Sequence, residues 1–367
     1  MKGAPTLPSI PTPSNSLERV SREIDRNMQR ARNGIKLAVG TSRPTFGWTP
    51  KDVVWRGGRS ELWRYRGPGG PGGTPLLVVF SLVSRSYILD LARGNSFVER
   101  LLDAGFDVYL LDWGVPDVRD ASNRLDDYAD GYIPAAIRRV QELSGASRVD
   151  VLGYCFGGVL TLLHAAHHPR APLNSLTVMA TPADFQAMGP LVEVFGSGSV
   201  DINAVLDENG NVPASIIRRV FRSLTPTYEI TKYVNLWERL WSDEYVAAYQ
   251  GVTRWSAEHI PFPGAAARQT VDMLLRDNAM VTDRLVVGGD RVSLSDIRVP
   301  FLSVRASRDH IVQAPASSPL IDLVGSADRD ELCLEAGHMG LVVGKTAHKT
   351  TIPTIIDFLK RRSEASA

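Results

Sequence analysis

Cysteine is scarce in this sequence, since only Cys155 and Cys333 occur among 367 residues. A disulfide framework is therefore excluded, and the chain suits a reducing compartment, which we take to be the cytoplasm. We expect Cys333 to lie in the core, whereas Cys155 stands in a glycine-rich turn that favours chemistry.

The sequence also has no large excess of charge of one sign: 41 basic and 40 acidic residues leave a formal net charge of +1. Nothing therefore favours nucleic acid or an anionic membrane as a partner. No apolar run is long enough for a transmembrane segment, and the proline-rich start has no apolar signal segment. A phosphate-binding glycine loop, a dinucleotide fingerprint and zinc-ligand spacing are missing too, so we expect no cofactor and no metal.

The N-terminal region predicts a tail followed by one helix. Prolines within residues 1–14 lack the backbone N–H that helices and β-sheets need for their hydrogen bonds, so we expect a disordered tail. Asn15 is a suitable N-cap, and apolar residues recur after it at helical spacing, which predicts an amphipathic helix in residues 15–48. Two interpretations stay open: the helix docks on the body of the protein, or it contacts a partner subunit or a granule.

Residues 49–181 and 285–362 alternate between strand and helix patterns. The expected strands lie near residue 53 and at 62–65, 76–80, 108–111, 149–152, 176–179, 301–304 and 331–334, with helices at 97–104 and 133–143. This alternation predicts an α/β fold with a mostly parallel sheet and helices on both faces. The apolar content of 44% allows a large core, and we expect one elaborated domain.

Residues 182–284 interrupt this alternation with helical periodicity and several aromatic residues. We interpret the insertion as a cap over the active site. Trp237, Trp241 and Trp255 either form the core of this cap, which we favour, or stack directly on a substrate.

A sharp turn joins the strand pattern at residues 149–152 to a helical pattern at 159–164, and Cys155 occupies its apex. The run Gly-Tyr-Cys-Phe-Gly-Gly resembles the nucleophile elbow of the α/β-hydrolase fold, in which flanking glycines permit a strained backbone. The N-terminus of the following helix favours a thiolate at this position. The alternative is a buried structural cysteine beside glycines that pack a helix.

The fold that the turn resembles supplies nucleophile, acid and histidine in this chain order. His338 follows the last predicted strand between two glycines, which makes it the candidate base rather than a surface histidine. Asp309 follows the strand at 301–304 and is the candidate acid, although it could instead cap a helix. We expect its neighbour His310 to support Asp309 and His338 without contacting the substrate itself.

An oxyanion needs two backbone donors in such a site. We expect them to be the N–H of Phe156, directly after the nucleophile, and an N–H near Val83 in the loop after the strand at 76–80. Trp113 ends another strand at the same edge, so it either shapes the pocket or anchors an ordinary loop.

Several motifs taken together resemble the polyhydroxyalkanoate synthases from about residue 53 to the C-terminal helix. These are GYCFGG (153–158), SRSYILDL (84–91), FDVYLLDWG (106–114), KYVNL (232–236), DHIV (309–312) and GHMG (337–340). The short chain resembles the class III catalytic subunit. Phe156 and Ser84 depart from the residues usual in that family, as does the segment 256–264.

The resemblance implies an α/β-hydrolase fold and an acyltransferase that polymerises (R)-3-hydroxyacyl-CoA and releases coenzyme A. It implies that Cys155 carries the acyl group, His338 activates it, and Asp309 assists attack by the 3-hydroxyl of the incoming substrate. It also implies a noncatalytic partner subunit and a polymer granule surface, and we expect a homo-oligomer. An acyl group moved from a thioester onto sulfur keeps its activation, which favours transfer over hydrolysis.

Two other functions remain open. Dienelactone hydrolases use a similar cysteine elbow, so a thiol-dependent ester or lactone hydrolase is the closest enzymatic alternative. A noncatalytic hydrolase-fold scaffold that assembles through its N-terminal helix is the second.

Overall fold

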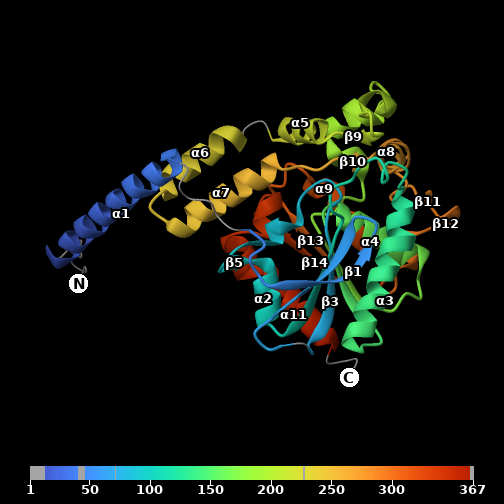
Figure 1. Cartoon of the computed structure of the whole chain (residues 1–367), viewed down its shortest axis with the longest axis horizontal. Helices are drawn as coiled ribbons and strands as arrows, with labels where there is room; N and C mark the ends of the chain where they lie inside the picture. The colour runs from blue at the N-terminus through green and yellow to red at the C-terminus, as the bar shows by residue number, and fades with distance from the viewer. Residues whose placement is uncertain (1–12, 40–45, 71, 226–227, 364–367) are drawn as a thin grey trace, which may run out of the picture. The chain divides into compact units, whose positions relative to one another are not determined.

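A sheet of eight strands forms the centre of the fold in this computed structural model, which describes residues 13–39, 46–70, 72–225 and 228–363 (Figure 1). The strand order is β1-β2-β6-β3-β7-β8-β13-β14. The strands are β1 (Lys51–Gly57), β2 (Ser60–Tyr65), β3 (Thr74–Val79), β6 (Phe106–Asp112), β7 (Val149–Tyr154), β8 (Leu173–Met179), β13 (Phe301–Ala306) and β14 (Arg329–Leu334). The pairs β1–β2 and β2–β6 are antiparallel and the other pairs of this sheet are parallel, so the sheet is mostly parallel as expected.

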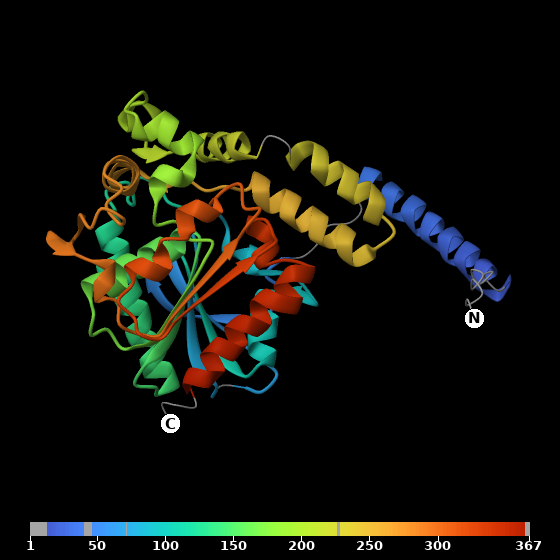
Figure 2. The ribbon, with the colours of Figure 1, turned by 180° about the vertical axis from the view of Figure 1, so that it is seen from behind.

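Helices cover both faces of this sheet (Figure 2). They are α2 (Phe97–Asp103) and α11 (Ile352–Ser363), which contact each other, and α3 (Ile133–Ser144) and α4 (Phe156–His167). Because both faces are covered, every residue of β7 is buried, and the strand is apolar except for Asp150. The Asp150 Oδ1 accepts hydrogen bonds from the side chains of Asn174 and Ser175.

Cys333 is exposed, so the expectation that it lies in the core was wrong. It belongs to β14, which forms one edge of the sheet and has exposed residues along most of its length. An apolar strand pattern at a sheet edge does not imply burial, because one side of such a strand has no neighbour.

The segment between β8 and β13 is largely helical. Its elements are α5 (Ala214–Leu224), α6 (Tyr228–Arg239), α7 (Asp243–Ala257), α8 (Gly264–Gln269), the paired strands β9 (Asn211–Val212) and β10 (Phe262–Pro263), and the hairpin of β11 (Leu285–Val287) and β12 (Asp290–Val292). Short elements elsewhere are β4 (Asp90–Ala92), β5 (Asn95–Ser96), α9 (Ala314–Ser317) and α10 (Leu320–Leu323).

Contacts divide the chain into two compact units. One contains Met1–Pro44 and Thr227–Gln250, and the other contains Thr45–Pro226 and Gly251–Ala367. The predicted insertion at 182–284 is therefore not one body, because its middle part groups with the N-terminal segment.

The N-terminal helix α1 (Pro13–Val39) begins at Pro13 instead of Asn15 and ends before residue 48. Proline suits the first turn of a helix, where its missing N–H is not needed. The predicted tail at 1–14 falls almost wholly outside the described residues. Within its own unit, α1 places the buried Asn33 side chain so that it donates to the Leu240 carbonyl at 2.8 Å.

The apolar stripe of α1 is exposed, since Val20, Ile24 and Met28 are each more than half exposed. Trp237 is 71% exposed and Trp241 also faces solvent, so the expectation that these tryptophans form the core of a cap was wrong for both. Trp255 is buried and donates to the Arg85 carbonyl at 2.6 Å. Among the described residues, no helix combines the length and apolar character that crossing a bilayer requires.

Two glycines allow α4 to approach the sheet closely. A Cβ atom on Gly157 would lie 2.2 Å from the Val79 carbonyl oxygen, and one on Gly158 would lie 2.0 Å from the Thr181 Oγ1. Neither side chain fits without a shift of the backbone, so these glycines set the position of the turn before α4.

We predict that Gly157→Ala destabilises the protein by about 1–3 kcal/mol, because the added methyl group overpacks the junction of α4 and β3. Gly131→Ala is the matched control, because a Cβ there meets none of the described atoms within 4 Å. Urea denaturation of both variants measures the difference. Equal midpoints for the two variants would contradict this account.

Candidate active site

Cys155 lies in the turn between β7 and α4 with φ 55° and ψ −123°. Positive φ is unusual for a residue with a side chain and marks a strained backbone. The Cys155 N–H donates to the Met179 carbonyl at 2.8 Å, which ties the turn to the end of the neighbouring strand β8. The predicted elbow is therefore present, with a cysteine at its apex.

His338 and Asp309 form a buried hydrogen-bonded pair. The His338 Nδ1 lies 2.7 Å from the Asp309 Oδ2, and the two residues are 6% and 4% exposed. Asp309 follows β13 and His338 follows β14. Because these are neighbouring parallel strands, the two residues lie at the same end of the sheet. The Cys155 sulfur lies close enough to His338 to raise the pKa of its ring. The structure thus brings the three predicted residues together.

The Asp309 carboxylate is held on both oxygens. Its Oδ1 accepts hydrogen bonds from the backbone N–H groups of Ile311 at 2.8 Å and Val312 at 2.9 Å, while its Oδ2 faces His338. These donors fix the orientation of the carboxylate.

Burial alone would lower the pKa of His338, but the neighbouring Asp309 carboxylate and Cys155 sulfur raise it to about 10. The effect of these two neighbours on the imidazolium outweighs the cost of desolvating it. The pair therefore favours a protonated His338 beside the sulfur at neutral pH.

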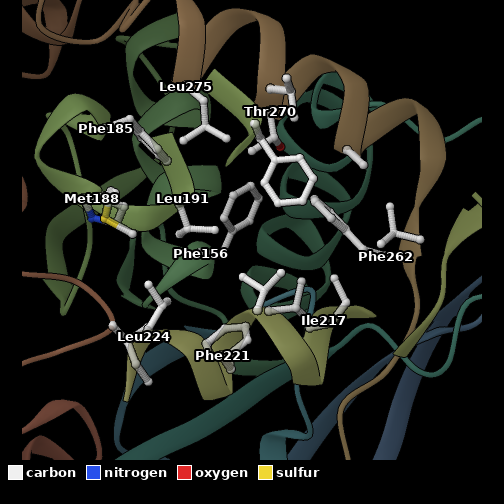
Figure 3. Close-up of a pocket in the computed structure, with 18 of the residues that line it drawn as sticks. Phe156, Phe185, Met188, Leu191, Ile217, Phe221, Leu224, Phe262, Thr270 and Leu275 are labelled. Carbon is white, nitrogen blue, oxygen red and sulfur yellow. The ribbon is translucent and has the colours of Figure 1, made fainter. Parts of the chain in front are cut away.

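An apolar cavity of about 160 Å³ adjoins Cys155 (Figure 3). In the figure the labelled side chains, among them Phe156, Phe221 and Phe262, converge on this space. The cavity is lined by Val83, Cys155, Phe156, Pro182, Phe185, Met188, Leu191, Phe195, Ile202, Val212, Ile216, Ile217, Val220, Phe221, Leu224, Phe262, Ala267, Thr270, Val271, Leu275, Ile311 and Val312. Most of these residues come from the segment between β8 and β13.

Phe156 forms one wall of the cavity and meets the Phe262 ring edge to face at 5.6 Å. Its N–H belongs to the first turn of α4, where the helix itself supplies no acceptor. Val83 lines the same cavity, and its carbonyl accepts from His259 Nδ1 at 3.2 Å. The proposed oxyanion donors therefore belong to residues beside Cys155, and their role stays a prediction.

Trp113 does not line the cavity. It is buried, donates from Nε1 to the Phe80 carbonyl at 2.7 Å and packs edge to face against Tyr128 at 5.0 Å. Trp113 thus supports the loop after β3 that leads to Val83, and its predicted place in the pocket was wrong.

His310 is exposed and does not support the pair of His338 and Asp309, contrary to our expectation. The hydrogen bonds from Ile311 and Val312 to Asp309 close a tight turn, which leaves His310 on the solvent side. His164 is buried and hydrogen-bonded to the Ala129 carbonyl.

The residues of α5 that line the cavity were not predicted from the sequence. Ile216, Ile217, Val220, Phe221 and Leu224 recur at helical spacing. This amphipathic pattern was visible in the sequence and could have identified them, since an apolar helix face within an insertion needs a partner.

Comparisons with known proteins show which family the chain resembles. The family model for the alpha/beta hydrolase fold matches residues 68–345. The chain is 34% identical to a poly(3-hydroxyalkanoate) polymerase subunit PhaC of Allochromatium vinosum, over 93% of this chain and 95% of the relative. It is 30% identical to the protein of the same name from Synechocystis, over 86% and 85%.

Solved structures support the fold. A thermophilic esterase from Thermogutta terrifontis matches with a TM-score of 0.53 at 15% identity, over 86% of this chain and 99% of the esterase. At this identity the likeness shows the fold alone. With the sheet topology, it confirms the predicted α/β-hydrolase architecture.

The raised pKa of His338 predicts how stability depends on pH. The folded pKa of about 10 exceeds the unfolded value near 6.5, so the charged imidazolium stabilises the fold fully below about pH 6.5 and progressively less up to about pH 10. We expect the unfolding free energies of the parent chain and His338→Gln to differ most at the acidic end of this window. Urea denaturation across the window measures this, and a difference that grows with pH would contradict it.

Proposed function

The chain belongs to the poly(3-hydroxyalkanoate) polymerase family of the α/β-hydrolase fold, and we propose that it builds such a polymer on a thioester at Cys155. The observation that carries this mechanism is the grouping of Cys155, His338 and Asp309 at one edge of the sheet, open to an apolar cavity. The substrate is a 3-hydroxyacyl-CoA, and the reaction needs no further cofactor.

In the first step the Cys155 sulfur attacks the thioester carbonyl of the substrate. The carbonyl electrons move to oxygen, where the N–H groups of Phe156 and Val83 stabilise the oxyanion. When the tetrahedral intermediate collapses, the bond to coenzyme A breaks and its sulfur takes a proton from the His338 imidazolium. The enzyme then holds the acyl group as a thioester, and His338 is neutral.

In the second step the neutral His338 accepts the proton of the 3-hydroxyl group that attacks this thioester. The new ester bond joins two monomers in a longer coenzyme A thioester, the Cys155 sulfur leaves as a thiolate, and His338 is again an imidazolium. Repetition of the first step with this longer thioester returns the growing chain to Cys155 and releases coenzyme A. The resemblance to the synthases assigns this proton to Asp309 instead. The geometry supports an orienting role for Asp309, because both of its oxygens already accept hydrogen bonds from His338 or from the backbone.

The cavity supports transfer over hydrolysis. Its wall is apolar and presents aromatic side chains such as Phe156 and Phe262 next to the sulfur. Such a wall binds an acyl chain and excludes water, which would otherwise compete for the thioester. The residues of the segment between β8 and β13 that line it support the interpretation of this segment as a cap.

We also propose that α1 contacts a noncatalytic partner subunit, that the enzyme works as a homo-oligomer, and that it acts at the granule surface in the cytoplasm. The exposed apolar residues Val20, Ile24 and Met28 on α1 support a partner surface.

Purified protein incubated with 3-hydroxybutyryl-CoA tests the function. We expect free coenzyme A together with insoluble polyester, because the acyl group passes to a hydroxyl group. Release of free 3-hydroxybutyrate alone would instead identify a thiol-dependent hydrolase, and no release of coenzyme A would indicate a noncatalytic scaffold.

Cys155→Ala should abolish turnover, since no acyl-enzyme can form without the sulfur. Cys155→Ser should at most hydrolyse substrate slowly, because an alkoxide is harder to generate than a thiolate. Cys333→Ser is the matched control and should retain activity, since Cys333 is exposed on β14. Polymer formation by the Cys155→Ala variant would refute the mechanism.

Asp309→Asn should slow acylation and chain extension alike, by about 10²–10⁴-fold, because both steps need a correctly oriented His338. Single-turnover measurement of coenzyme A release, followed by extension from a preloaded primer, separates the two steps. Loss confined to extension would assign the base role to Asp309 itself.

A further inference from the structure

Three side chains with metal-binding groups converge where α4 ends. The Asp130 Oδ1 lies 2.9 Å from the His167 Nδ1 and 3.0 Å from the His168 Nε2. One ligand atom from each of the three residues lies within 4.8 Å of the other two. Because α4 begins directly after Cys155 and ends at His167, the cluster stands about 18 Å along the helix from the active site.

Two neighbouring histidines reach one point because the helix stops between them. Successive helical residues project in different directions, about 100° apart. His168 has φ −121° and ψ 71° and has left the helix, so its ring turns back toward that of His167 at a centroid distance of 4.7 Å. Asp130 enters from the short helical segment Asp127–Tyr132.

We propose that Asp130, His167 and His168 bind a divalent transition-metal ion, with Zn²⁺ as the best match. Two imidazole nitrogens and one carboxylate oxygen form a common donor set for this ion. Metal–ligand distances of about 2.0–2.2 Å place tetrahedral ligand atoms about 3.4 Å apart. The two hydrogen bonds, at 2.9 and 3.0 Å, therefore need to open by about 0.4–0.5 Å, as the ion replaces the protons they share.

The surroundings of His167 match those of a metal ligand. Its second nitrogen, Nε2, lies 3.2 Å from the Asp290 Oδ2. A ligating histidine usually donates its other N–H to a carboxylate in this way, which fixes the ring and makes the ligating nitrogen more basic. Asp290 belongs to β12, and the turn before it brings Gly288 against His167 and Asp130.

A second observation points to a ligand in this place. His164 lines the same cavity as the three proposed ligands and is 3% exposed. Its Nδ1 donates to the Ala129 carbonyl at 2.8 Å, but its buried Nε2 has no hydrogen-bond partner among the described residues. This unpartnered nitrogen belongs to a residue in the wall of the cavity that holds the cluster.

The charge around the cluster is mixed. Arg138 and Arg170 also line the cavity and weaken the attraction for a cation, whereas the carboxylates of Asp130 and Asp290 strengthen it. The bound ion would cross-link the segment 127–132, the end of α4 and, through Asp290, the β11–β12 hairpin. We therefore assign it a structural role.

The test uses the full chain without a histidine tag, in a Cys155→Ala, Cys333→Ser background that removes both thiols as zinc ligands. After treatment with a chelator and its removal, Zn²⁺ is titrated calorimetrically, and thermal unfolding is recorded with and without the ion. We expect one saturable site and a higher Tm with Zn²⁺. Absence of saturable binding overturns the proposal.

Variants locate the site. His168→Gln should abolish saturable binding, and Asp290→Asn should weaken it about 10–100-fold because it removes only the partner of a ligand. His310→Gln is the matched control, since that exposed histidine is remote from the cluster, and it should bind as the parent does. Both His168 and Asp290 are well exposed, and equal Tm values in chelator verify that the variants fold. Unchanged binding in His168→Gln contradicts the proposed site.

Discussion

The hydrogen bond between Asp309 and His338 is the interaction on which the site depends. It is buried, and it joins the ends of the neighbouring strands β13 and β14. Two backbone N–H groups hold the carboxylate, the carboxylate holds the imidazole, and the imidazole stands beside a sulfur whose own position is set by a strained turn. Each group is thus fixed by a rigid element, which lowers the cost of orienting it during reaction. Gly157 and Gly158 also contribute, because they allow α4 to come close enough to the sheet for the turn at Cys155 to form.

The cavity next to Cys155 determines what a thiolate at this position can do. A cysteine elbow by itself is compatible with hydrolysis and with transfer, since both begin with an acyl-enzyme. Our proposal of transfer rests on the apolar wall of aromatic and branched side chains, which would retain an acyl chain and keep water from the thioester. Phe156 contributes to both parts of this site: its backbone N–H faces the reaction as a proposed donor, and its ring packs on Phe262 in the cavity wall.

The sequence allowed the sheet and the three central residues of the site to be predicted because local patterns carry them. Glycines around Cys155, apolar strands before Asp309 and His338, and chain order were sufficient. The errors concern residues whose environment depends on distant segments. Cys333 lies on an edge strand, Trp113 turns toward Tyr128, and a turn made by Asp309 excludes His310. The proposed metal site could not be predicted from a local sequence motif, because Asp130 precedes His167 by 37 residues.

The central claim is that the sulfur of residue 155 carries the acyl group during polymer growth. Mass spectrometry of the intact chain after brief exposure to 3-hydroxybutyryl-CoA, followed by mapping of its peptides, tests this most directly. We expect added mass in multiples of the 3-hydroxybutyryl unit, and only on the peptide that contains Cys155. Hydroxylamine should remove this added mass. Polymer produced by a chain whose Cys155 peptide stays unmodified, or acyl groups found on another residue, would contradict it.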